Sequence, residues 1–143
     1  DRLAVMRGGR IIQVGEGEAL YRHPKHMFVA EFLGRINRLQ RTPEDIVNHT
    51  VNIAQITVPC PPSPWPELFV RPEDIELRPH DTQQPAATIT QRSFLGDRIH
   101  YRLEVVGQGA LTAEAHRDSP YRVGDRVSFT IAPEHFIPCE NDQ

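Results

Sequence analysis

The sequence predicts a mainly β fold, a small barrel or sandwich preceded by a short α/β segment. Three observations support this prediction. Short β-branched or alternating apolar runs recur after Gly34, and Gly-Asp or Gly-rich turns separate most of them. Helical periodicity is confined to the first 33 residues. Hydrophobic residues make up 38% of the 143 residues and charged residues 24%, which is a composition that folds rather than stays disordered.

The first segment, residues 1–33, predicts a β-hairpin followed by helices. Two apolar runs flank Gly8-Gly9, and glycine accepts the positive φ that two-residue hairpin turns require. Residues 27–33 carry their apolar side chains at helical spacing, and Gly34 is a typical helix end. This segment is too short to bury a core of its own, so we expect it to complete a separate domain. We place the domain boundary between residues 33 and 34.

The second segment, residues 34–143, predicts the β-rich domain. Its proline-rich stretch at 59–66 cannot be a central strand, because proline donates no ladder hydrogen bond, and it is interpreted as a surface loop. The predicted strands are Val51–Val58, Leu68–Val70, Ile75–Leu77, Ala87–Phe94, Arg98–Val106, Ala110–Ala115 and Val127–Ile131.

Between two of these strands lies a charged corner, Arg71-Pro72-Glu73-Asp74. Pro72 fixes its own φ and holds Arg71 in extended geometry, so the carboxylates that follow form one tight turn. Arg71 is close enough in sequence to reach either carboxylate, which predicts a local, exposed ion pair. An acid/base role would need a nucleophile or a histidine nearby, and neither stands close in the sequence. We therefore interpret the corner as structural rather than catalytic, and Arg71, Glu73 and Asp74 are the candidate regulatory corner of the domain.

The net charge and the spacing of cysteines and histidines argue against several classes of function. The net charge is −3, which argues against a nucleic-acid surface, because phosphate binding requires clustered cations. Cys60 and Cys139 predict incidental thiols rather than a disulfide framework. His23 and His26 are interrupted by Pro24 and have no third ligand at fixed spacing, so no metal site is predicted. No apolar run approaches the ~20 residues that cross a bilayer.

Several motifs taken in order resemble one family. The stretch "DRLAVMRGGRIIQVGEGEALYRHPKHMFVAEFLGRINRL" is similar to the end of the nucleotide-binding domain of bacterial ABC importer ATP-binding subunits, with Ala19 where Glu is common. "LFVRPEDIEL", "RSFLGDRIHYRLEV" and "YRVGDRVSFTIAPEHF" resemble the regulatory domain appended to those subunits, the transport-associated OB-like (TOBE) domain. The resemblance implies an OB-like barrel from residue 34 onward.

The resemblance also implies a function. The parent subunit would be a transport ATPase that uses ATP and Mg, bound to permeases at the cytoplasmic face of the membrane. This chain has no GxxxxGK[ST] loop, acidic magnesium site or signature motif, so we expect it to bind no cofactor and to be no enzyme. The regulatory domain would pair with a second copy of itself. Phe94, Leu95 and Gly96, two apolar residues before a turn, are the candidate dimer contact, with core burial of Phe94 as the alternative.

The substrate and one other function stay open. "FLGRINRLQ" and "SFLGDRIHYRL" resemble the branch that imports sulfate, iron, polyamines or thiamine. The alternative function is a free-standing OB-like module that binds a small oxyanion or single-stranded nucleic acid. Arg98 and Arg102 with aromatic Tyr101 suggest the latter, but strand alternation turns Tyr101 to the opposite face.

Overall fold

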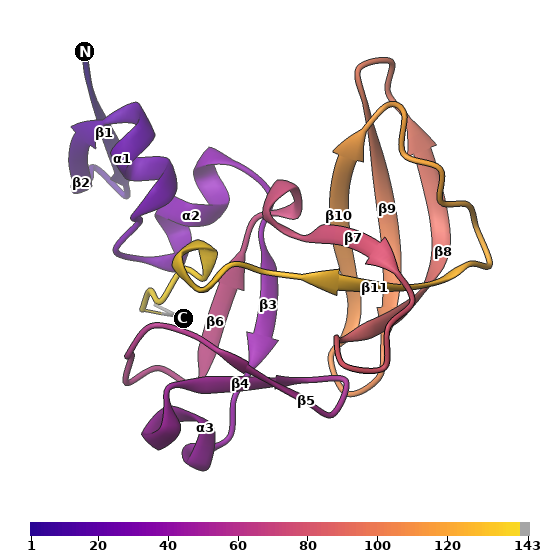
Figure 1. Ribbon diagram of the computed structural model, residues 1–143. Helices are drawn as coiled ribbons and strands as arrows, with labels where there is room; N and C mark the ends of the chain where they lie inside the picture. The colour runs from indigo at the N-terminus through magenta and orange to yellow at the C-terminus, as the bar shows by residue number, and fades with distance from the viewer. Residues whose placement is uncertain (141–143) are drawn as a thin grey trace.

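The computed structural model describes residues 1–140, and Figure 1 shows three regions in a row. A hairpin and two helices lie at one end, two small ladders form the middle, and a five-stranded sheet forms the other end. The fold is mainly β, as predicted. Along the described residues, no helix is both long and apolar enough to span a membrane.

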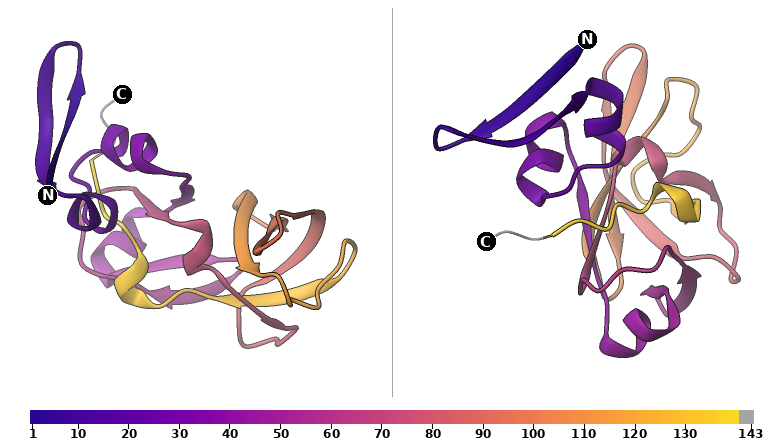
Figure 2. Two further views of the ribbon diagram at one scale, coloured as in Figure 1. Left: turned by 90° about the horizontal axis from the view of Figure 1, so that it is seen from above. Right: turned by 90° about the vertical axis from the view of Figure 1, so that its left-hand side faces the viewer.

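The N-terminal region contains the predicted hairpin and helix. The antiparallel pair β1 (Arg2–Arg7) and β2 (Arg10–Glu16) turns at Gly8 and Gly9, whose φ angles are 59° and 80°. Helices α1 (Gly17–Arg22) and α2 (Met27–Leu33) follow. Only a small core is buried here, formed by Val5, Leu20 and Val29. The hairpin projects away from the rest of the molecule (Figure 2) and leaves apolar side chains such as Leu3 and Ile11 exposed.

The large sheet confirms the predicted strands of the C-terminal half. Its antiparallel order is β10-β9-β8-β11-β7. One face is apolar and packs inward, because alternate residues of a strand point to opposite faces. The strands are β7 (Glu76–Pro79), β8 (Ala86–Phe94), β9 (Arg98–Val105), β10 (Gly109–His116) and β11 (Arg126–Thr130).

The middle region corrects the sequence analysis. The predicted strand Val51–Val58 is wrong: it is a hairpin of β4 (Thr50–Ile53) and β5 (Ile56–Pro59). Its turn residues Ala54 and Gln55 have φ angles of 50° and 69°, although neither is glycine. Two further elements were not predicted, namely β3 (Asn37–Gln40), which pairs with β6 (Glu67–Val70), and helix α3 (Pro43–Asn48).

Candidate functional site

The charged corner is the site at which the three regions meet. Arg71 lies directly after β6 and before η1 (Pro72–Asp74), a single 3-10 turn that leads into β7. Its backbone is extended, with φ −73° and ψ 148°, as expected for a residue before proline. The side chain turns inward and is only 1% exposed. A fully buried cation must find hydrogen-bond acceptors, since leaving it unpaired would cost several kcal/mol, on the order of the penalty for a desolvated ion.

Arg71 finds its acceptors on the N-terminal region. Nη1 donates to the carbonyl oxygens of Ala30 at 2.8 Å and Arg35 at 3.1 Å, and Nη2 donates to that of Tyr21 at 3.1 Å. The Tyr21 and Ala30 carbonyls lie in the last turns of α1 and α2, where helices leave acceptors unsatisfied and carry partial negative charge. The guanidinium also lies 4.0 Å from the centroid of the Tyr21 ring. One side chain therefore joins both helices to the β region.

The predicted ion pair within the corner is wrong. Among the described residues, Arg71 forms no ion pair with Glu73 or Asp74, because its donors point away from solvent into the backbone contacts above. Glu73 instead accepts a hydrogen bond from the Tyr21 hydroxyl. Burial and this bond together raise the pKa of Tyr21 to about 12. The corner thus holds Tyr21 from two sides.

Asp74 has a partner that the sequence analysis missed. His135 Nδ1 lies 3.6 Å from Asp74 Oδ1, so the expectation that no histidine stands near the corner was wrong. His135 belongs to η2 (Pro133–His135), and no local pattern signals its approach to a residue so distant in sequence. Burial raises the pKa of Asp74, and the nearby His135 opposes that shift.

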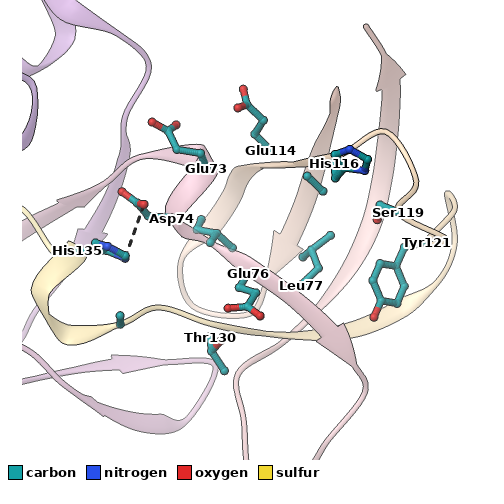
Figure 3. A pocket seen from close by; sticks show the side chains of 13 residues that line it. Glu73, Asp74, Glu76, Leu77, Glu114, His116, Ser119, Tyr121, Thr130 and His135 are labelled. Carbon is teal, nitrogen blue, oxygen red and sulfur yellow. Dashed lines mark ion pairs between the residues drawn. The ribbon is translucent and has the colours of Figure 1, made fainter. Parts of the chain in front are cut away.

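A cavity of about 410 Å³ opens beside the corner, between the sheet edges β7 and β10 (Figure 3). Four carboxylates and two histidines contribute to its polar lining. Ser119, which also lines it, accepts a hydrogen bond from the Tyr101 hydroxyl at 2.9 Å. Within residues 1–140, no three His, Cys, Asp or Glu side chains are placed to hold a metal ion. The acidic residues of the lining are Glu73, Asp74, Glu76 and Glu114.

The candidate dimer contact lies at the tip of the β8–β9 hairpin. Phe94 and Leu95 are 59% and 48% exposed, so the alternative that buries Phe94 in the core is wrong. Gly96 has a φ of 99°, which suits glycine in this turn, and Leu95 N donates to Arg98 O at 2.8 Å to close it. The tip is free to make a contact, and its role in a dimer stays a prediction.

The structure also shows where the other residues discussed in the sequence analysis lie. Tyr101 is buried on the face opposite Arg102, as strand alternation predicted. Cys60 and Cys139 are both buried, and neither forms a disulfide within residues 1–140; burial raises the pKa of the Cys60 thiol. Asn37 went unnoticed in the sequence, yet its side chain bonds both the N–H and the carbonyl of Thr112.

Comparison with known proteins identifies a matching domain family and several relatives of this chain. The TOBE domain family matches residues 68–137. The chain is 37% identical over 123 residues to the sulfate/thiosulfate import ATP-binding protein CysA of Burkholderia mallei, covering 83% of this chain and 35% of that protein. It is 30% identical over 151 residues to the spermidine/putrescine import ATP-binding protein PotA of Rubrobacter xylanophilus, covering 96% of this chain and 40% of that protein.

A third relative is named for the import of a different compound. The putative 2-aminoethylphosphonate import ATP-binding protein PhnT of Salmonella typhimurium is 28% identical over 154 residues, covering 98% of this chain and 41% of that protein. The chain thus spans well under half the length of these relatives, and it matches their C-terminal part. The sulfate and polyamine branches that the sequence suggested are both represented. The chain carries a TOBE domain, and over most of its length it is similar to the C-terminal part of ABC importer ATP-binding subunits.

Proposed function

We propose that this chain is the regulatory and dimer-forming part of the ATP-binding subunit of an importer, and that the Arg71 corner transmits movement between the ATPase domain and the TOBE domain. In this proposal the ATPase part ends at residue 33 and the TOBE part begins at residue 34. The observation that carries the proposal is the set of three hydrogen bonds from Arg71 to the carbonyl oxygens of Tyr21, Ala30 and Arg35.

The Arg71 contacts can transmit movement because they form a rigid connection. The segment 1–33 has a small core of its own, so its position depends on contacts with the β region. A buried guanidinium with three acceptors fixes direction as well as distance, because its donors lie in one plane. Met27 adds an apolar contact with Phe69 and Ile137. A movement of the helices is therefore passed to β6 rather than absorbed by a flexible joint.

The complete subunit would hydrolyse ATP with Mg and work with two permeases at the cytoplasmic face of the membrane. Residues 1–143 carry no phosphate loop, so this part would supply regulation and pairing rather than chemistry. A ligand that binds only the folded state raises its melting temperature. We expect MgATP to leave the melting temperature of residues 1–143 unchanged, and a clear shift would contradict the assignment of this part as non-catalytic.

The test of transmission uses the full-length subunit reconstituted with its permeases. Arg71→Met should lower substrate import while ATP hydrolysis continues, because the ATPase domain keeps its site but loses its fixed attachment. Arg41→Met is the matched control: it also removes a buried arginine, but one whose side-chain hydrogen bonds within residues 1–140 go to the segment from Thr50 to Trp65. Import and hydrolysis that stay coupled in Arg71→Met would refute the proposed transmission.

The dimer contact is tested separately with Leu95→Asp. Leu95 is half-exposed at the hairpin tip, so the charge should leave the far-UV circular dichroism spectrum unchanged. At a two-fold contact the same charge would occur twice and split the dimer, which sedimentation measures. A folded variant that still pairs would place the dimer contact elsewhere.

A further inference from the structure

Two amide side chains connect the middle ladder to the edge of the large sheet. β10 is the last strand of that sheet, and the strand paired with β3 is β6. β3 nevertheless lies between β6 and β10 (Figure 1), and side chains bridge it to the β10 side. These side chains belong to Asn37 in β3 and to Gln108 in the turn directly before β10, and we call them the amide joint.

Asn37 is the inner half of the amide joint and is only 7% exposed. Its Oδ1 accepts a hydrogen bond from the N–H of Thr112 at 2.7 Å, and its Nδ2 donates to the Thr112 carbonyl at 2.9 Å. The same Nδ2 donates to the Val70 carbonyl at 3.2 Å. That carbonyl belongs to the peptide bond that leads to Arg71. One amide group therefore connects the middle of β10 directly to the Arg71 corner.

Gln108 is the outer half of the amide joint and is half-buried. Its Oε1 accepts from the N–H of Gln40 at 3.1 Å, and its Nε2 donates to the Gln40 carbonyl at 3.4 Å. Nε2 also donates to the carbonyl of Asn52 in β4 at 3.0 Å. Each amide thus bonds to both the N–H and the carbonyl of one residue, as a residue of a neighbouring antiparallel strand does.

The inner half of the joint is stiff. Both N–H donors of Asn37 Nδ2 are used, one for the Val70 carbonyl and one for the Thr112 carbonyl. Rotation of this side chain would leave buried donors and acceptors unpaired, which is unfavourable. When the corner is displaced, β10 must therefore follow, because the amide cannot absorb the displacement by turning.

From the joint, β10 leads to the candidate dimer contact. β10 pairs with β9 over its whole length, and β9 pairs with β8 as far as Phe94. The β8–β9 hairpin carries the candidate contact residues Phe94, Leu95 and Gly96 at its tip. Strands that share continuous ladders move together, since shifting one alone would break several hydrogen bonds at once. A displacement at Thr112 therefore reaches the tip.

We propose that Asn37 and Gln108 are positioning residues that carry the movement of the Arg71 corner into the large sheet and so set the position of the candidate dimer contact. This inference rests on the proposed function, because it starts from the coupling at Arg71. It adds the route by which that coupling continues, from Val70 through Asn37 to Thr112. Opening the joint should uncouple import from hydrolysis even though Arg71 keeps all its hydrogen bonds.

Import and ATP hydrolysis by the full-length subunit with its permeases test the proposal. Asn37→Leu opens the inner half of the joint, and Gln108→Leu opens the outer half at a half-buried position in a turn. Each should lower the amount imported per ATP hydrolysed by about twofold or more, as substitutions along a coupled route do. Gln40→Leu is the matched control, because it removes an amide from the same strand whose side chain bonds to Glu67 of β6. It should leave that ratio unchanged.

The double variant Arg71→Met/Asn37→Leu gives a readout that a loss of stability alone would not produce. Two residues on one route act in series, so the double variant should uncouple import no further than Arg71→Met does. Independent effects would instead add. If Asn37→Leu does not fold, Arg71→Met/Gln108→Leu provides the same measurement.

Three results would overturn the proposal and leave the proposed function standing. They are normal coupling in either folded single variant of the joint while Arg71→Met is uncoupled, an equal loss of coupling in Gln40→Leu, and an additive loss in the double variant. Import and hydrolysis that stay coupled in Arg71→Met would refute the proposed function and this inference together.

Discussion

Two buried arginines stand at opposite ends of the same two-stranded ladder. Arg41 directly follows β3, and Arg71 directly follows β6. Arg41 is 7% exposed and Arg71 is 1% exposed. Both donate to backbone carbonyl oxygens rather than to carboxylates. Arg41 Nη2 binds the carbonyl oxygens of Ser63 at 3.0 Å and Trp65 at 2.6 Å, within the proline-rich loop.

The difference between them is the distance along the chain that each contact spans. The acceptors of Arg41 lie 9 to 24 residues away, so it closes a local loop. Those of Arg71 lie 36 to 50 residues away, so it joins two regions. The same chemistry therefore serves a local purpose at one end of the ladder and a long-range purpose at the other. Substituting each arginine should therefore loosen a different part of the structure. For Arg41 this is the proline-rich loop, and for Arg71 it is the N-terminal region.

Arg71→Met should have the largest effect. It removes the cation and leaves three carbonyl oxygens without their donor, a loss of about 3–5 kcal/mol. Hydrogen exchange should show that residues 19–35 lose protection while β8, β9 and β10 keep theirs. Uniform loss of protection over the whole chain would mean that Arg71 supports global stability rather than the attachment of one region.

Arg41→Met should cost about 2–4 kcal/mol, since fewer short hydrogen bonds are lost. Trp65 is the single tryptophan of the chain and lies in the loop that Arg41 holds. Its fluorescence should shift to longer wavelength as the loop loosens. Arg71→Met serves as the control and should leave the Trp65 emission wavelength unchanged. The same shift in both variants would mean that the two arginines do not have different roles.

Gly34→Ala tests how closely the helices approach the corner. A Cβ at Gly34 would lie 3.2 Å from Tyr21 Cε1 and 3.4 Å from Arg71 Nη1, so one of the two must move. We expect a loss of about 1–3 kcal/mol, the usual effect of overpacking, measured by urea unfolding. Gly8→Ala in the exposed turn is a useful contrast, because nothing lies near its Cβ and only its positive φ opposes the change. An unchanged midpoint for Gly34→Ala would show that the corner can relax.

Tyr21→Phe should give the smallest effect, and one that fades as the pH rises from about 10 towards 12. The pKa of Tyr21 is raised to about 12 in the folded protein, above the ordinary value of about 10. The unfolded chain then releases this proton first, so the Tyr21 contribution is complete below about pH 10 and is lost as the pH rises towards 12. Urea unfolding at a series of pH values should show a shallower decline in Tyr21→Phe. Identical slopes would mean that Glu73 does not hold the hydroxyl.

Local patterns were enough for most secondary structure. The Gly8-Gly9 hairpin, helix α2 with its end at Gly34 and the strands of the large sheet all follow from spacing and turn residues close to them in sequence. Helix α3 also had a signal that was overlooked: Thr42 and Asp45 form a capping box around Pro43. The β4–β5 turn had none, because Ala54 and Gln55 are not typical residues for positive φ.

Sequence patterns also predicted the mainly β fold, the family and the corner at Pro72, since each depends on residue types in a short order. Tertiary structure decided which way Arg71 points. Its acceptors are backbone carbonyls, which every residue carries and no side-chain pattern marks, and they come near only after the chain has folded. The same holds for His135 beside Asp74. Burial and charge balance at these places depend on distances in space that neighbours in sequence do not encode.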